Sequence, residues 1–205
     1  MACGVRPQVK VVLASGNPGK VREIQAIAGA GFELVLQSSL DITEAPEPHS
    51  TFVENALSKA RHASRAAHLP ALADDSGLCV DALGGEPGVN SAYYAGHKGN
   101  RDERDARNNA RLLAELEDDR RAYYCCVMVL VRHPEDPRPL IAEGLWYGEI
   151  ARSARGTNGF GYDPLFLLPN GKTAAELASE EKNRISHRAA ALRKLLELVH
   201  AADRH

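Results

Sequence analysis

This sequence lacks cysteines at any spacing that would hold a metal. Its four cysteines are Cys3, Cys79, Cys125 and Cys126, and their spacing matches no metal-binding pattern. Neighbouring side chains of a strand point to opposite faces, so the adjacent pair cannot face one common partner. The sequence therefore predicts reduced thiols, as in a cytoplasmic protein.

The sequence also lacks an excess of charge of one sign and a long apolar run. Lysine and arginine total 25 against 27 aspartate and glutamate residues, which leaves no basic field for duplex nucleic acid. No apolar stretch approaches the roughly 18 residues of a membrane helix, and the N-terminus has no apolar targeting segment. We therefore expect a cytoplasmic protein that binds neither a nucleic acid polymer nor a membrane.

Internal repeats and low-complexity linkers are also absent. A chain of 205 residues is long enough for one sizeable hydrophobic core. We therefore expect a single domain over residues 1–205.

Two adjacent carboxylates, Asp74 and Asp75, follow a short apolar run that is typical of a buried strand. Ser76-Gly77 then predicts a tight exit from that strand. Only one of the two aspartates can readily face a given site, and carboxylate oxygens are ligands that Mg²⁺ prefers. The alternative is an Asx turn in which both aspartates cap backbone amides.

Residues 15–20 form a polar loop between a predicted strand at 9–14 and a predicted helix. Asn17 suits the N-cap and Pro18 the first helical position, which puts Lys20 beside free backbone amides. Such a helix end attracts phosphate. The alternative is an ordinary capped helix start, since the loop does not match the Walker pattern.

A second helix is predicted from Thr51, which forms a capping box with Glu54, to Ala67. Asn55 and Lys59 are four residues apart, so they share a face and can reach one ligand, unless both are simply solvated. Glu47, just before this helix, can join Asp75 at a cation or be loop charge.

Glycines frame Phe160 and Tyr162 in residues 155–164, and such a loop offers an aromatic surface to a base or sugar. Further along, Ser186 is predicted to cap the last helix. Cations gather at that helix start against the helix dipole, which favours an anionic or carbonyl-rich ligand. The alternative is a solvated basic patch. The cations are Lys182, Arg184, His187 and Arg188.

The remaining patterns predict the scaffold. Residues 32–36, 123–131 and 140–150 read as strands, the last two as antiparallel neighbours. Residues 101–117 are highly charged and predict an exposed amphipathic helix without a chemical role.

Five ordered motifs between Val11 and about Leu196 resemble the inosine triphosphate pyrophosphatase family. They are Ser15-Gly16-Asn17-Pro18-Gly19-Lys20, Thr51-Phe52-Val53-Glu54-Asn55-Ala56, Ala73-Asp74-Asp75-Ser76-Gly77, Gly159-Phe160-Gly161-Tyr162-Asp163-Pro164 and Ser186-His187-Arg188. The resemblance implies a pyrophosphatase that converts ITP, dITP and XTP to the monophosphate and pyrophosphate. It also implies Mg²⁺ as cofactor, a homodimer, and an α/β fold with an elongated mixed sheet flanked by helices, its two lobes enclosing an active-site cleft.

The resemblance also assigns site residues by motif position. Asp75 becomes the proton acceptor and a metal ligand, with Glu47 as the second ligand. The residues assigned to binding the triphosphate are Ser15, Gly16, Asn17, Pro18, Gly19 and Lys20. Lys59 adds positive charge, and Ser76 contacts the substrate. The residues assigned to binding the nucleoside part of the substrate are Phe160, Gly161, Tyr162, Asp163, Lys182, His187 and Arg188. The family has glycine where His49 stands, which leaves the path of that loop open.

Two alternatives remain at this stage. One is a pyrophosphatase for other modified nucleotides, such as methylated pyrimidine triphosphates. The other is a nucleotide-binding regulator without turnover, which Asp75 argues against because an acid facing a triphosphate repels it unless a metal intervenes.

Overall fold

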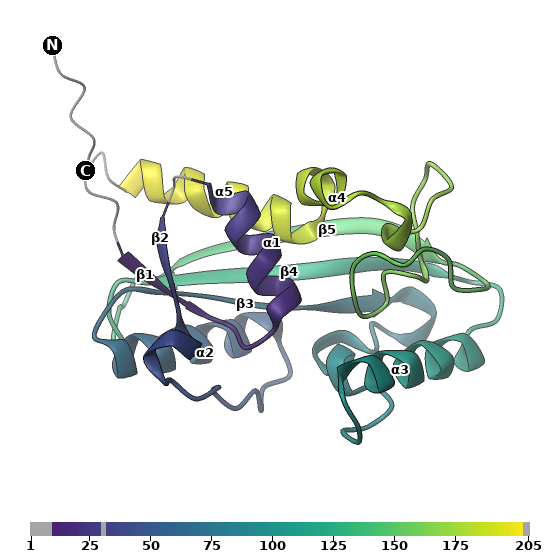
Figure 1. Cartoon of the computed structure of the whole chain (residues 1–205), viewed down its shortest axis with the longest axis horizontal. Helices are drawn as coiled ribbons and strands as arrows, with labels where there is room; N and C mark the ends of the chain where they lie inside the picture. The colour runs from purple at the N-terminus through teal and green to yellow at the C-terminus, as the bar shows by residue number, and fades with distance from the viewer. Residues whose placement is uncertain (1–9, 30–31, 203–205) are drawn as a thin grey trace, which may run out of the picture.

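A six-stranded mixed β-sheet forms the centre of the protein, as the computed structural model shows for residues 10–29 and 32–202 (Figure 1). The strands are β1 (Lys10–Ala14), β2 (Glu33–Leu36), β3 (Ala71–Val80), β4 (Arg121–Val131), β5 (Leu140–Ile150) and β6 (Phe166–Leu167). Their spatial order is β2-β1-β3-β4-β5-β6. β1 is parallel to β2 and β3, whereas β3 to β6 pair antiparallel. The expected α/β class with a mixed sheet is confirmed.

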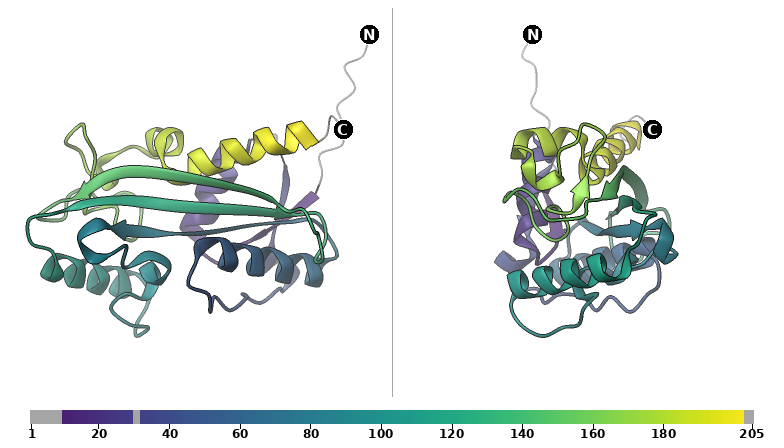
Figure 2. Two further views of the ribbon diagram at one scale, coloured as in Figure 1. Left: turned by 180° about the vertical axis from the view of Figure 1, so that it is seen from behind. Right: turned by 90° about the vertical axis from the view of Figure 1, so that its right-hand side faces the viewer.

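Helices cover the sheet on two sides. They are α1 (Pro18–Ala28), α2 (Phe52–Ala67), α3 (Arg101–Glu115), α4 (Ser179–Ile185) and α5 (His187–Ala202). Figure 1 shows α1, α4 and α5 along one side and α2 and α3 along the other, and the two views in Figure 2 agree. Within residues 10–29 and 32–202, no helix has both the length and the apolar character needed to cross a membrane.

The two longest strands differ in pattern because they differ in burial. β4 lies in the interior of the sheet, and its apolar run is buried along almost its whole length. β5 alternates: Ala142 and Trp146 are buried, whereas Ile141 and Tyr147 are exposed. A strand with one solvated face is expected to alternate in this way. The predicted antiparallel pairing of these two segments is confirmed.

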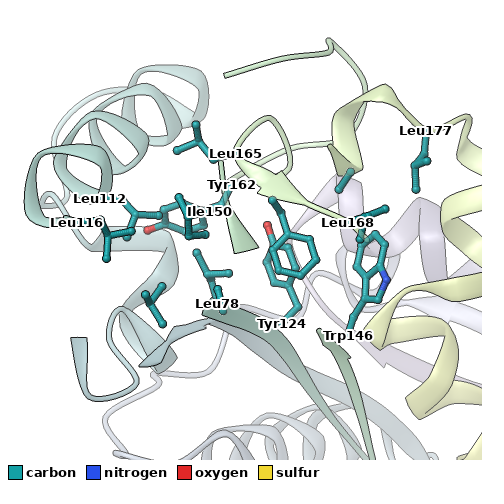
Figure 3. Packing of buried hydrophobic residues seen from close by; sticks show 14 residues of the cluster. Leu78, Leu112, Leu116, Tyr124, Trp146, Ile150, Tyr162, Leu165, Leu168 and Leu177 are labelled. Atoms are coloured by element: carbon teal, nitrogen blue, oxygen red, sulfur yellow. The ribbon is translucent and has the colours of Figure 1, made fainter. Parts of the chain in front are cut away.

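A hydrophobic cluster at one end of the sheet fixes α3 and the glycine-rich loop that precedes β6 (Figure 3). Leu112 of α3 and Leu165 of the loop are fully buried in the same cluster as Leu78, Tyr124 and Trp146 of the sheet. The cluster therefore joins segments that are far apart in the sequence. It positions the segment that carries Phe160.

The unequal lengths of β1 and β3 leave part of β3 unpaired on one side. β1 ends at Ala14, which pairs with Ala73, whereas β3 continues to Val80. Asp74 and Asp75 are therefore the first residues beyond the cover of β1. A site can form there because that side of β3 no longer faces a neighbouring strand.

The expected exit turn at Ser76-Gly77 is wrong. Both residues lie inside β3 and pair with Cys126 and Cys125 of β4. Glycine is needed at position 77 for another reason, because a β-carbon there would lie 2.1 Å from the carbonyl oxygen of Gly88. Gly88 begins a 3-10 helix, η3 (Gly88–Tyr93), so glycine allows that segment to approach the strand.

The cysteines in the described part of the chain agree with the sequence analysis. Cys79, Cys125 and Cys126 are buried free thiols. Burial raises the pKa of the Cys125 thiol to about 12, so this thiol stays protonated at neutral pH. Cys3 lies outside the described residues.

Candidate active site

One pocket of about 1130 Å³ is lined by Asp75, Glu47 and every residue that the resemblance assigns to the substrate. Asn55 and Arg184, which the sequence analysis also named, are not part of its wall. Its walls come from the loop before α1, from β3 and α2, from the loop around Phe160, and from α4 and α5. Residues up to about 170 positions apart in the sequence therefore meet in one place. The roles of the individual residues stay predictions, and the contacts below show what each side chain can do.

Asp75 faces α2, and two residues of that helix hold its carboxylate. Lys59 Nζ donates to Oδ1 at 3.0 Å, and Asn55 Nδ2 donates to Oδ2 at 3.3 Å. Asn55 and Lys59 therefore share one helix face and the same partner within the protein, whereas their reach to a ligand stays a prediction. Burial raises the pKa of Asp75, Lys59 and Lys20 oppose that rise, and the net direction is upward. A carboxylate with a raised pKa is better suited to accept a proton near neutral pH.

Glu47 completes this carboxylate group. Its Oε2 lies 3.2 Å from Lys59 Nζ, so Glu47 and Asp75 meet at one ammonium group. Burial works against the charge of Lys59, but the surrounding carboxylates, Asp75 first, outweigh it and raise the pKa of Lys59. Lys59 is therefore a permanent cation at this position.

The donor set at Asp75 fits Mg²⁺. Hard carboxylate oxygens are the ligands Mg²⁺ takes, and it usually binds through only one or two of them, completing its shell with water and substrate phosphates. Asp75 and Glu47 are such a pair, and in this structure both carboxylates contact the Lys59 ammonium group. No group of three or more His, Cys, Asp or Glu side chains suited to a metal occurs within residues 10–29 and 32–202.

His49 does not disturb the path of the Glu47 loop. Its backbone N–H donates to Asn55 Oδ1 at 3.0 Å, and its carbonyl accepts from Asn55 Nδ2 at 3.2 Å. These contacts use backbone atoms, which any residue type provides. Among the described residues, only Asp41 and His68 have a positive φ without being glycine, so the position of His49 does not require glycine.

Asp74 faces the opposite side of β3 and is fully buried among donors. Its Oδ2 lies 3.1 Å from Lys20 Nζ and 3.4 Å from Arg188 Nη2, and it accepts from Ser76 Oγ at 3.2 Å. Burial alone would raise the pKa of Asp74, but Lys20, Arg188 and Lys59 together hold it well below its usual range. Asp74 is therefore an anion that organises the cations around it.

The loop before α1 is capped as the sequence predicts, but its amides are not free. Asn17 Oδ1 accepts from Gly19 N–H at 2.9 Å and from Lys20 N–H at 3.2 Å. The expectation of unpaired amides beside Lys20 is therefore wrong at these two positions. The reason is that Asn17 itself is a good N-cap and satisfies them. Attraction for an anion at this loop must come more from side-chain cations than from these amides.

The aromatic loop is tied to the site by Asp163 and by Gly19. Asp163 Oδ2 accepts from the Phe160 N–H at 2.9 Å and pairs with Lys182. A β-carbon at Gly19 would lie 2.6 Å from the Phe160 ring, so glycine lets the ring lie against the start of α1. Tyr162 is buried in the core, and its hydroxyl donates to the Ser91 carbonyl at 2.9 Å.

Lys182 and Arg188 are buried cations that share Glu23. Lys182 Nζ lies 2.9 Å from Glu23 Oε1 and 4.9 Å from the centre of the Phe160 ring. Arg188 pairs with Glu23 Oε2 and donates to Ser76 Oγ at 2.9 Å. Burial works against the charge of Arg188, but Asp74 and Glu23 raise its pKa further above its usual value. The solvated-patch alternative for these two residues is wrong.

His187 is a neutral ring at the base of the pocket. It stacks on Tyr124 with ring centres 4.6 Å apart and an interplanar angle of 10°. Burial first, and then Arg188 and Lys182, hold the pKa of His187 well below its usual range. Its Nδ1 is buried and has no partner among the described residues. A ring nitrogen in that state can pair with a polar group of a ligand.

Sequence reasoning missed the contribution of α3 and of Glu23. Asp105 Oδ2 accepts from Gly161 N–H at 2.8 Å, and Asn109 Nδ2 donates to the Gly161 carbonyl at 3.0 Å, so α3 holds the aromatic loop. Arg101 of α3 also reaches the pocket. The i, i+4 spacing of Asp105 and Asn109 indicates that both lie on one polar face of the helix. It does not indicate that this face contacts the loop at Gly161.

Comparisons with known proteins agree with this geometry. The Ham1 family profile matches residues 11–198. A protein of Ralstonia nicotianae named dITP/XTP pyrophosphatase is 60% identical over 192 residues, which cover 92% of this chain and 95% of that protein. A HAM1 protein structure from Coxiella burnetii has a TM-score of 0.86 and 45% identity, covering 94% and 99% of the two chains. A structure from Mycobacterium abscessus, described as a nucleoside-triphosphatase or dITP/XTP pyrophosphatase, has a TM-score of 0.70 and 44% identity, covering 91% and 98%.

Proposed function

The chain belongs to the Ham1 family, and on that premise we propose that it is a nucleoside triphosphate pyrophosphatase acting on ITP, dITP and XTP. This membership confirms the resemblance drawn from the five motifs. The observation that carries the proposal is the pocket that gathers Asp75, Lys59, Lys20, Phe160 and Arg188, together with relatives whose names state this activity. The products are the nucleoside monophosphate and pyrophosphate.

The reaction is hydrolysis at the α-phosphorus. Asp75 accepts a proton from water, the water oxygen forms a bond to the α-phosphorus, and the bond from that phosphorus to the bridging oxygen breaks. Pyrophosphate leaves with the electron pair of the broken bond. Lys59, 3.0 Å from Asp75, orients the carboxylate and lies close to the charge that develops on the phosphates.

Asp75 and Glu47 would hold the divalent cation, for which we propose Mg²⁺. Bound there, Mg²⁺ supplies neutralisation of the charge on the pyrophosphate leaving group. Asn55 has a supporting task, since it contacts both the Asp75 carboxylate and the backbone of the Glu47 loop. One side chain thereby links the Asp75 carboxylate to the loop that carries Glu47.

The nucleoside end selects the base through its donors. A purine stacked on Phe160 comes close to Lys182, whose ammonium has three protons and two carboxylate partners. The remaining proton can pair with an oxygen at purine position six, which hypoxanthine and xanthine carry and adenine does not. An analogue that leaves such a donor unpaired can be rejected by about 10⁴ to 10⁵.

We propose further that residues 1–205 form one domain with two lobes around the pocket, and that the protein is a cytoplasmic homodimer. The exposed Ile141 and Tyr147, on one face of β5, support a self-association surface. Light scattering should give twice the monomer mass. A monomer at high concentration would contradict the dimer.

Pyrophosphate release tests the activity. We expect strong release from ITP, dITP and XTP, weak release from ATP, and loss of all release when a chelator removes Mg²⁺. Guanine carries the same position-six oxygen, so release from GTP tests whether a further contact excludes its 2-amino group. Equal turnover of ATP and ITP would contradict the polarity argument. Tight binding of ITP without any release would identify a nucleotide-binding regulator instead.

A further inference from the structure

Most cations of the pocket are already paired with carboxylates of the protein itself. Lys20 pairs with Asp74, Lys59 with Asp75 and Glu47, Lys182 with Glu23 and Asp163, and Arg188 with Glu23 and Asp74. A nucleoside triphosphate brings several further negative charges. Beyond the charge that Mg²⁺ would neutralise, a side-chain cation without a carboxylate partner favours its binding.

The loop before α1 is also short of free donors. The N–H groups of Gly19 and Lys20 both donate to Asn17 Oδ1. The amides that a helix start commonly offers to phosphate are therefore engaged at these two positions. Some other donor must serve an anion at this loop.

Arg101, the first residue of α3, supplies a cation at that point. Its Nη1 donates to Asn17 Oδ1 at 2.6 Å, and its guanidinium carbon lies 5.9 Å from the centre of the Phe160 ring. Within residues 10–29 and 32–202 it forms no ion pair with a carboxylate. Burial raises the pKa of the nearby Asp105 and the charge of Arg101 opposes that rise, but the two form no ion pair, and Asp105 Oδ2 accepts from the Gly161 N–H.

Other arginines of α3 differ from Arg101 in their contacts. Arg104 donates to the Gly99 carbonyl and lies over the Tyr93 ring. Arg107 donates to the Lys98 carbonyl and is not part of the pocket wall. Only Arg101, among these three, touches the loop before α1. A guanidinium has five N–H donors, and the contact to Asn17 occupies one of them.

We propose that Arg101 is a further substrate-binding residue, whose guanidinium binds the phosphate chain of the nucleotide beside the loop before α1. The inference rests on the proposed function, because it assigns a role toward the same substrate. Arg101 is tethered by a neutral amide oxygen, so its charge remains available to an anion. Planar guanidinium groups bind phosphate oxygens with two parallel hydrogen bonds, which gives geometric specificity as well as attraction.

The test compares Arg101→Met and Arg101→Lys with Arg107→Met, which removes the same charge from the same helix. For Arg101→Met we expect kcat/KM for ITP to fall about 10- to 100-fold, the effect of one charge-assisted hydrogen bond. The inhibition constant of inorganic pyrophosphate should rise by a similar factor, while that of IMP stays unchanged. Arg101→Lys should fall in between, and Arg107→Met should behave as the wild type.

Three results would overturn the proposal. One is a kcat/KM for Arg101→Met equal to that of Arg107→Met. Another is equal weakening of IMP and pyrophosphate, which would put Arg101 at the nucleoside end. Thermal unfolding checks that the variants fold. If Arg101→Met does not fold, Arg101→Lys takes its place, and the third contradicting result is an inhibition constant of pyrophosphate for Arg101→Lys equal to that of the wild type.

Failure of the proposed function would look different, because the wild type itself would release no pyrophosphate from ITP. In that case calorimetry measures the affinity of inorganic pyrophosphate for the wild type and for Arg101→Met. This comparison tests the contact between Arg101 and the anion without relying on turnover. Weaker binding to the variant supports the contact, and equal binding overturns it.

Discussion

Asp74 and Asp75 are neighbours in the sequence, yet they lie on opposite faces of β3 in opposite surroundings. Asp74 is enclosed by Lys20, Arg188 and Ser76, and the cations hold its pKa well below its usual range. Asp75 lies at the pocket, where burial raises its pKa despite Lys59. Two carboxylates whose pKa values are pushed apart have different tasks. Asp74 is suited to hold cations in place, and Asp75 to exchange a proton.

The contrast follows from which element covers each face. The Asp75 face meets α2, which contributes one cation, Lys59, and the neutral Asn55. The Asp74 face meets α1 and α5, which contribute Lys20 and Arg188. At Asp74 the charges of Lys20, Arg188 and Lys59 outweigh burial, whereas at Asp75 burial, with Glu47 adding to it, outweighs Lys59 and Lys20. The predictions below change one face at a time.

The largest effect is expected from Asp75→Asn. The amide cannot accept the proton of the attacking water, and loss of such a general base reduces kcat by about 10³-fold or more. The free energy of unfolding should change less than for Asp74, because burial already disfavours the charge of Asp75 and Lys59 keeps Glu47 as a counter-charge. Pyrophosphate release and chemical unfolding measure the two quantities. Asp119→Asn, at the exposed surface, is the matched control. Activity near that of the wild type would remove the catalytic role of Asp75.

Asp74→Asn should lower stability more than Asp75→Asn. Removing one partner of a buried ion pair destabilises a protein by about 3–5 kcal/mol, because Lys20 and Arg188 lose a buried counter-charge. Urea unfolding measures the difference. If the two aspartates have equal effects on stability, the contrast between the faces is wrong.

The stability effect of Asp74 should also depend on pH. Its pKa is lower in the folded state than its ordinary value of 3.8, so its contribution is present above that value and is lost as pH falls below it. The difference between the wild type and Asp74→Asn should therefore be largest at neutral pH and shrink below pH of about 4. A difference that grows on acidification would contradict the assigned direction.

A smaller effect is expected from Lys59→Met. This change leaves Asp75 and Glu47 without their shared cation, and loss of one charge-assisted hydrogen bond corresponds to about a 10- to 100-fold fall in kcat/KM. Lys10→Met is the control, because Lys10 pairs with Glu33 at an exposed position. Wild-type kcat/KM in Lys59→Met would show that the cation on the Asp75 face has no part in the reaction.

Much of the scaffold could be predicted from the sequence. Local patterns predicted β5 with the bounds that the structure has, and they placed the starts of α1 and α2 at Pro18 and just after Thr51. These features depend on residues within one or two turns of each other. The exit turn at Ser76-Gly77 was wrong because a glycine in a strand also marks a close backbone approach, and Gly88 is distant in the sequence.

The candidate site was predictable in its residues but not in its contacts. The pocket contains Asp75, Glu47 and every substrate-binding residue that the resemblance assigned, together with others, such as Arg101, that the sequence analysis did not name. The motifs did not reveal that Asn17 satisfies the amides of its own helix, or that Glu23 pairs with two cations. The charged residues of α3 were interpreted as a solvated helix face, because the sequence does not indicate that the loop with Gly161 packs against this helix.

The sequence by itself determined most of the elements, the candidate site residues and the family, because these depend on local patterns and on ordered motifs. Only the tertiary structure decided that β1 ends at Ala14, which pairs with Ala73, while β3 continues. This difference in length opens the pocket at Asp74 and Asp75. The tertiary structure alone also decided which of the two aspartates loses its proton more readily. The physical reason is that a pKa depends on burial and on charges within a few ångströms, and here those charges come from helices at both ends of the chain.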